Sequence, residues 1–264
     1  MCDAVRAHGA VPVVSGVAAG AALVGLDDEV LERFLTRGAT KVSARDLGHA
    51  IAMGRDGSTT VAASLTIATV AGIDVFATGG IGGVHRRDTP LTPLDESADL
   101  AELAVNPVIT VCAGAKSILD IPSTLERLET YGVAVVGYRT DEFPGFFTAR
   151  TGLRVPARVD SVEDVAATFL AGRALGRRGG LLVVQAPPEA GALDTLTVEN
   201  AVAEALLAAA KSAVRGPALT PFLLAAVERA TGGASLKANL ALLQANAARA
   251  ARIAAALAVA RRAT

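Results

Sequence analysis

Aromatic residues are scarce in this sequence. The 264 residues include no tryptophan, two tyrosines and seven phenylalanines, which together make up 3% of the chain. The hydrophobic fraction is nonetheless 52%, so the core must consist mainly of aliphatic side chains. A chain of this length and composition can bury enough apolar surface for one α/β domain, and we expect residues 1–264 to form a single domain.

The sequence also lacks an excess of either charge. Its 25 basic and 26 acidic residues give a net charge of −1, which provides no basic field for a nucleic acid. No apolar run is long enough to cross a membrane, and the glycine-containing stretch at 17–26 suits a buried strand pair. With two cysteines, Cys2 and Cys112, the chain has neither a disulfide framework nor metal-ligand spacing, so we expect a cytoplasmic protein.

Short β-branched runs alternate with longer helical patterns along most of the chain. Alternation of this kind predicts a three-layer α/β/α fold with a mostly parallel central sheet, followed by a helical C-terminal region after Gly191. The predicted strands are 11–14, 75–77, 108–111, 133–136 and 181–184. The predicted helices are 29–36 behind an Asp27-Asp28 cap, a stretch opened by Ser58 or Thr59 and reaching Val70, a helix from Ser117 to Tyr131, and C-terminal helices with breaks at 215–217 and 232–235.

Lysine is rare here, which draws attention to Lys116. The chain has four lysines among its 25 basic residues, at positions 41, 116, 211 and 237. Unlike arginine, a lysine can lose its proton and attack a carbonyl carbon. Lys116 follows a predicted strand, at the start of a predicted helix whose dipole would favour the neutral amine. It is therefore either a nucleophile or an ordinary surface lysine at a helix start.

Two other predicted strand-end loops contain residue types that bind small ligands. The segment 78–86 has four glycines with Thr78, His85 and Arg86, and predicts either an anion-binding loop or a tight connection between packed elements. The segment 95–99 has three carboxylates before a helical pattern. Such carboxylates either cap the helix or hold a divalent ion through water.

Several uncommon motifs occur in one order and resemble the pseudouridine-5′-phosphate glycosidase family, which is also known through its indigoidine-synthase-A-like members. The resemblance continues through 160–161 and 220–224 to Asn239, so it covers nearly the whole chain. The matching segments are residues 41–47, 78–86, 95–100, 112–120 and 137–144.

This resemblance implies reversible cleavage of the C–C bond of pseudouridine 5′-phosphate, giving uracil and ribose 5-phosphate. It implies that Lys116 is the nucleophile that forms a Schiff base, that Asp95 binds Mn²⁺ or another divalent cation, and that the protein is a homotrimer. The residues that it places against the substrate are Lys41, Val61, Thr78, His85, Ser97, Ala98, Asp99 and Asn239.

The sequence departs from the family pattern at two places. The segment from His85 to Asp95 is about two residues longer than usual and includes Arg87. The family's N-terminal segment, with a Glu-Ser-Thr motif whose glutamate donates a proton, has no counterpart before Ala10. We therefore expect weak turnover from the chain as written, because losing a general acid costs about 10²- to 10⁴-fold in rate.

Two other functions remain open from the residues alone. One is a different Schiff-base lyase or aldolase acting on a phosphorylated pentose. The other is a sugar-phosphate binding protein without catalytic activity, which would bind ligand without turnover.

Overall fold

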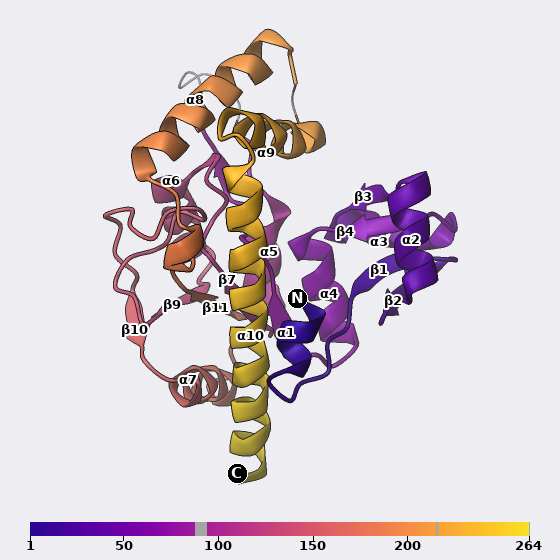
Figure 1. Ribbon diagram of the computed structural model, residues 1–264. Coiled ribbons are helices and arrows are strands. Elements are labelled where there is room, and N and C mark those ends of the chain that lie inside the picture. Colours follow the sequence, from indigo (N-terminus) through magenta and orange to yellow (C-terminus); the bar gives the residue numbers. More distant parts are fainter. Residues whose placement is uncertain (88–93, 215, 264) are drawn as a thin grey trace.

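A five-stranded parallel sheet forms the centre of the protein. The computed structural model describes residues 1–87, 94–214 and 216–263. All four neighbouring strand pairs of this sheet are parallel. In spatial order the strands are β10 (Ala157–Val159), β9 (Ala134–Tyr138), β11 (Leu181–Val184), β7 (Ile109–Cys112) and β5 (Val75–Ala77) (Figure 1).

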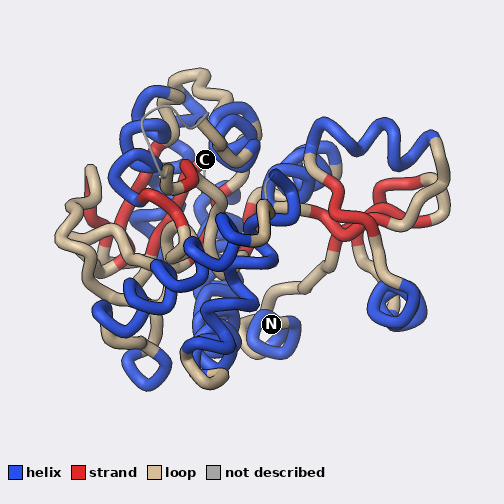
Figure 2. The backbone as a smooth tube through the Cα atoms, turned by 90° about the horizontal axis from the view of Figure 1, so that it is seen from above, coloured by secondary structure: helices blue, strands red, loops and turns tan. Residues whose placement is uncertain are grey.

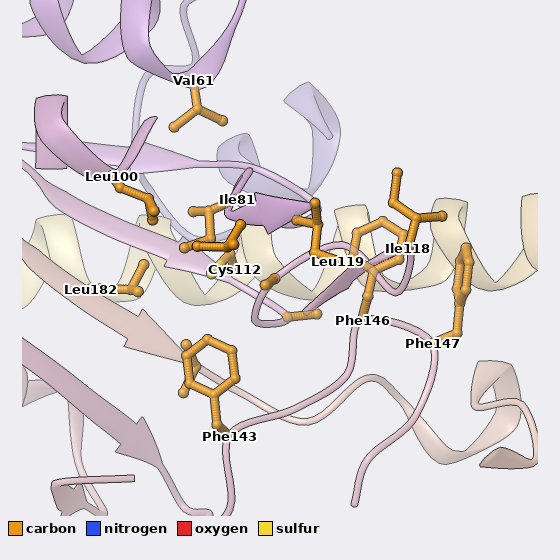
Figure 3. Packing of buried hydrophobic residues seen from close by; sticks show 14 of the residues in the cluster. Val61, Ile81, Leu100, Cys112, Ile118, Leu119, Phe143, Phe146, Phe147 and Leu182 are labelled. Atoms are coloured by element: carbon orange, nitrogen blue, oxygen red, sulfur yellow. The ribbon is translucent and has the colours of Figure 1, made fainter. Parts of the chain in front are cut away.

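Helices cover both faces of this sheet. Along β11, Leu181 and Val183 point to one face and Leu182 and Val184 to the other, as expected from the two-residue period of a strand. The first face packs on α7 (Val162–Ala174) and the long helix α10 (Ala234–Ala263). The other face contributes to the larger core, to which α5 (Ala98–Val105), α6 (Ile121–Thr130), α8 (Thr195–Lys211) and α9 (Leu219–Ala230) also contribute. Figure 3 shows part of this core, including Leu182 of β11 and Leu100 of α5. The predicted three-layer α/β/α fold and the helical C-terminal region are confirmed.

A smaller mixed sheet lies beside this body. Figure 2 shows its strands set apart from those of the central sheet. In spatial order they are β2 (Ala21–Val24), β1 (Ser15–Ala18), β4 (Gly57–Thr59) and β3 (Thr40–Val42). The helical segments of this region are α1 (Cys2–Arg6), α2 (Asp28–Arg37), the 3₁₀ turn Ala44–Asp46 and α3 (Leu47–Ala52).

Helix α4 (Val61–Val70) joins the two regions because it is buried on nearly every side. Its Ala63 and Ile67 pack in the small core of the N-terminal region, whereas Val61 and Leu65 belong to the large core. Two short strands, β6 (Val84–His85) and β8 (Leu119–Asp120), pair antiparallel next to the central sheet. Within 1–87, 94–214 and 216–263, no helix is long and apolar enough to cross a bilayer.

Most predicted elements are present, and two predictions were wrong. Residues 11–14 are not a buried strand: Val11 is 87% exposed and the strand begins at Ser15. Pro12 has no N–H to donate to a neighbouring strand, which explains this result. The helix predicted from Ser117 begins instead at Ile121 behind an Asp120 cap.

The core position of α10 leads to a prediction about stability. Leu242 is fully buried in the large core, whereas Leu240 on the same helix is 55% exposed. We expect Leu242→Ala to lower the free energy of unfolding by about 2–5 kcal/mol, because it leaves a cavity. Leu240→Ala should change it by less than about 0.5 kcal/mol. Urea denaturation of both variants tests this, and equal losses would contradict the packing described for α10.

Candidate active site

A cleft of about 760 Å³ lies between the N-terminal region and the ends of the central strands. The N-terminal region contributes β3, β4, the 3₁₀ turn and the first turn of α4. The body contributes the loops that follow β5 and β7, and α9 adds Thr220, Pro221 and Leu224. The carboxyl ends of parallel strands are where ligands collect in α/β proteins, so this is the position expected for an active site.

Backbone hydrogen bonds join the glycine-rich loop to the loop that contains Lys116. Ala113 N–H donates to Gly79 O at 2.9 Å, Ile81 N–H to Gly114 O at 3.0 Å, and Lys116 N–H to Ile81 O at 3.1 Å. Gly114 has a φ of +84°, and a side chain there would overlap the carbonyl oxygen of Pro144. Only glycine fits this turn, and the turn sets the direction of the backbone just before Lys116.

Lys116 itself is partly buried in the cleft, and its surroundings favour the neutral amine. Burial lowers the pKa of its amine below the ordinary value of 10.5. The Asp99 carboxylate opposes this shift in pKa, and the positive charge of Lys41 adds to it. From the sequence, the neutral amine was attributed to the dipole of the following helix, and this cause was wrong. That helix begins five residues later, at Ile121, so its dipole does not act at Lys116.

His85 and Asp95 lie together at another side of the cleft. The backbone N–H of His85 donates to the backbone carbonyl oxygen of Asp95 at 2.9 Å, and both residues line the cleft. Burial lowers the pKa of the His85 imidazole, although the Asp95 carboxylate acts in the opposite direction. The positive charge of Lys41, and that of Lys116 when its amine is protonated, lower it further, so the neutral ring is favoured at neutral pH.

Asp99 is 3% exposed and both of its carboxylate oxygens accept backbone hydrogen bonds. One oxygen accepts from Ala62 N–H at 2.9 Å and the other from Gly82 N–H at 2.7 Å. Ala62 is in the first turn of α4, where N–H groups have no partner within the helix. Asp99 therefore caps α4 and fixes the glycine-rich loop, and it places a negative charge near Lys116. Ser97, not Asp95, is the cap of α5.

The glycine-rich loop uses most of its donors within the protein. The N–H groups of Thr78, Ile81, Gly82 and Val84 donate to Val111 O, Gly114 O, the Asp99 carboxylate and Thr124 Oγ1. The structure thus favours a tight connection over an anion-binding loop. Arg86 was also suggested as an anion donor, but its guanidinium is paired with Glu199 and lies outside the residues that line the cleft.

The structure brings together nine of the ten predicted site residues. Those that line the cleft are Lys41, Val61, Thr78, His85, Asp95, Ser97, Ala98, Asp99 and Lys116. The tenth, Asn239 on α10, lies against Gly79 and is not part of the lining. A different asparagine on α10, Asn246, donates to Thr78 O at 2.8 Å and so supports the loop from behind. Residues 88–93 of the lengthened loop lie outside the described part of the chain.

The carboxylates around Asp95 fit a hydrated divalent ion better than a site formed by protein ligands alone. Among the residues that the structure describes, no three His, Cys, Asp or Glu side chains are grouped as metal ligands. Glu96 is paired with Arg127, and Asp99 has two amide partners. Asp95 is exposed at the cleft, and no hydrogen bond ties its carboxylate to the described chain. One carboxylate with retained water is a usual arrangement for Mg²⁺ or Mn²⁺.

Some residues of the cleft were not predicted from the sequence. Ser43 and Asp46 line it and form a capping box, with Ser43 N–H donating to Asp46 at 3.1 Å. The Ser-x-x-Asp spacing was visible but is common at helix starts. Thr60 caps α4 at the edge of the cleft, where the predicted start was Ser58 or Thr59.

Comparisons with known proteins identify the family of this chain. The family described as indigoidine synthase A like protein matches residues 1–256. A protein named pseudouridine-5′-phosphate glycosidase from Gemmatimonas aurantiaca is 57% identical over 258 residues, which are 97% of this chain and 83% of the relative. One with the same name from Herpetosiphon aurantiacus is 52% identical, covering 96% and 83% of the two chains.

Two solved structures are similar over almost the whole chain. The prealnumycin C-glycosynthase AlnA in complex with ribulose 5-phosphate has a TM-score of 0.92 and 42% identity, over 99% of this chain and 86% of that one. An indigoidine synthase A (IdgA)-like protein from Thermotoga maritima has a TM-score of 0.88 and 36% identity, over 96% and 82% of the two chains.

The charge of Lys41 leads to a prediction about pH. Lys41→Met removes a positive charge that lowers the pKa of Lys116, so that pKa should rise towards its ordinary value. Trapping of Lys116 by glycolaldehyde and cyanoborohydride increases with pH as the amine loses its proton. We expect the midpoint of this increase to move to higher pH in Lys41→Met, measured by intact mass. Glycolaldehyde has no phosphate, so the result does not depend on sugar-phosphate binding.

The exposed Lys237 on α10 provides the matched control. Lys237→Met removes a charge of the same sign that does not act on Lys116, so its midpoint should equal that of the unmodified protein. An unchanged midpoint in Lys41→Met would show that Lys41 does not act on the amine.

Proposed function

The chain belongs to the indigoidine synthase A like protein family, and from this premise we propose that it cleaves and forms the C–C glycosidic bond of pseudouridine 5′-phosphate. The observation that carries the proposal is the amine of Lys116, partly buried in the cleft with a lowered pKa. Relatives named for this activity at 57% and 52% identity support the choice of substrate.

A lysine suits this bond because a C-glycoside has no leaving oxygen to protonate, which rules out the usual pair of carboxylates. In the proposed reaction the Lys116 Nζ lone pair bonds to C1′ while the C1′–O4′ bond breaks, and the nitrogen passes a proton to O4′. The lone pair left on nitrogen then forms the C1′=N bond as the C1′–C5 bond breaks. Uracil C5 takes that bonding pair and a proton from solvent, and an iminium remains at C1′. Water hydrolyses it, releasing ribose 5-phosphate and the free amine.

The other residues of the cleft bind and orient the substrate in this proposal. Lys41 supplies a positive charge for the phosphate. Thr78, His85 and Ser97 offer polar groups on the walls, and Val61 is an apolar contact. Ala98 and Asp99 complete the segment that we propose next to the substrate. Asn239 is placed behind Gly79, and the contact predicted for it stays a prediction.

We also propose a divalent cation, Mn²⁺ foremost, held by Asp95 and water next to the substrate. Such an ion, when bound, supplies positive charge that orients anionic and hydroxyl groups of the sugar phosphate. A homotrimer and a cytoplasmic location complete the proposal. The two cysteines, which form no disulfide, are in keeping with a reducing compartment.

A second candidate is C–C bond formation with an acceptor other than uracil. It is favoured by the similarity to a C-glycosynthase crystallised with ribulose 5-phosphate. The same Lys116 adduct would serve both reactions, so the acceptor distinguishes them. Condensation of ribose 5-phosphate with uracil, compared with other aromatic acceptors, decides between the two candidates.

The central test of the proposal is a covalent adduct on Lys116. Incubation with ribose 5-phosphate and borohydride should add one sugar phosphate to the intact mass. In a separate incubation without reductant, ribose 5-phosphate should condense with uracil. Lys116→Ala and Lys116→Arg should both abolish the adduct, because a guanidinium stays protonated. Lys211→Ala, which changes an exposed lysine on α8, should behave as the unmodified protein. An adduct that persists in Lys116→Ala would overturn the assignment.

A second test concerns the cation. Asp95→Ala should weaken Mn²⁺ binding, measured by calorimetry, and should leave the melting temperature nearly unchanged because Asp95 is in an exposed loop. Asp141→Ala removes an exposed carboxylate that pairs with Arg158, away from the cleft, and should bind Mn²⁺ normally. Equal Mn²⁺ affinity in the Asp95 and Asp141 variants would remove Asp95 from the metal site.

A further inference from the structure

Arg86 directly follows His85, the last residue of β6, but it does not line the cleft. His85 lines the cleft, whereas Arg86 lines a neighbouring cavity formed partly by Ser117, Leu119 and Glu199. Arg86 is therefore behind the loop that contains Lys116.

The guanidinium of Arg86 binds that loop at two points. Its Nη2 donates to Ser117 O at 3.1 Å and its Nε donates to Leu119 O at 3.1 Å. Ser117 is the residue next to Lys116. Lys116 N–H donates from the other side to Ile81 O at 3.1 Å, so the short loop is held between the glycine-rich segment and Arg86.

Glu199 fixes the orientation of the guanidinium. Arg86 Nη1 donates to Glu199 Oε2 at 2.7 Å and Nη2 donates to Oε1 at 2.9 Å, which is a two-pronged pair. Such a pair restrains the planar group in one orientation, and a lysine could not reproduce all four contacts. Glu199 belongs to α8, and α8 packs against α9, whose Thr220 and Leu224 line the cleft.

We propose that Arg86 is a positioning residue for Lys116, and that its pair with Glu199 couples the placement of α8 and α9 to the placement of the reacting amine. The inference rests on the proposed function, because it requires Lys116 to form the covalent bond. Arg86 has no direct contact with the cleft, so it acts through the backbone of the loop.

The inference predicts a defect in the covalent step and not in sugar-phosphate binding. In Arg86→Lys, the rate of trapping of ribose 5-phosphate on Lys116 should fall by about 10- to 100-fold, as expected for a misplaced reacting group. The KM for ribose 5-phosphate in the condensation with uracil should stay within about twofold while kcat falls with the trapping rate. Glu199→Gln should give a smaller loss of the same kind. The double variant should be no slower than Arg86→Lys, because both changes disrupt the same set of contacts between Glu199, Arg86 and the loop of Lys116.

Arg150→Lys is the matched control, because Arg150 lines the same neighbouring cavity but pairs with Glu142. It should react as the unmodified protein, and circular dichroism should show that every variant is folded. If the Arg86→Lys variant traps ribose 5-phosphate on Lys116 as fast as the unmodified protein does, the inference is overturned while the proposed function stays intact. If Arg86→Lys does not fold, Glu199→Gln decides by the same criterion. Absence of an adduct in the unmodified protein would instead overturn the proposed function and this inference with it.

Discussion

Three backbone hydrogen bonds between the loops after β5 and β7 set the geometry on which the cleft depends. They join residues 79–81 to residues 113–116, and they extend the parallel pairing of the two strands past the end of the sheet. Each bond is worth only about 0.5–1.5 kcal/mol of net stability. Their role is geometric, because they fix the conformation of the backbone just before Lys116. Only glycine fits at position 114 in that conformation.

Asp99 transmits this geometry to the N-terminal region. Its two oxygens tie the first turn of α4 to Gly82, so the lobe that supplies Lys41 cannot shift freely against the loop that supplies Lys116. The same carboxylate raises the pKa of Lys116, against the effect of burial. Burying a charge costs free energy unless the charge is paired or hydrogen-bonded. The Asp99 carboxylate is stabilised by two backbone N–H donors instead of a cation. Among the described residues, no ion pair within 4.0 Å is formed by the Lys116 amine, so Asp99 acts on it as a nearby charge.

The sequence predicted the central sheet well because its strands are short aliphatic runs bounded by glycine, proline or polar residues. β11 was predicted at its observed bounds, 181–184, and β7 and β9 were shifted by one or two residues. Local patterns failed where tertiary contacts decide. Nothing in the motif after β7 shows that Lys116 to Asp120 would form a turn and a short strand paired with β6 before the helix begins.

The residues that line the cleft were predicted from the order of the motifs, not from local chemistry. Each segment alone had an ordinary structural explanation, and for the glycine-rich loop that explanation agrees with the observed hydrogen bonds. Partners far along the chain could not be inferred: Glu199 is 113 residues from Arg86, and Asn246 is 168 residues from Thr78. These contacts depend on how α8 and α10 pack, and no short spacing encodes that packing.

Under the proposed function, Lys41 links substrate binding to the reactivity of Lys116. Before substrate binds, burial lowers the pKa of Lys116 and the positive charge of Lys41 adds to this effect. A phosphate bound to Lys41 would neutralise that charge, so part of this effect would be lost once the substrate is in place. Burial is the larger cause, and a substrate that fills the cleft excludes more water from the amine. The neutral amine is thus favoured before binding by burial together with the charge of Lys41, and after binding by burial and the exclusion of water.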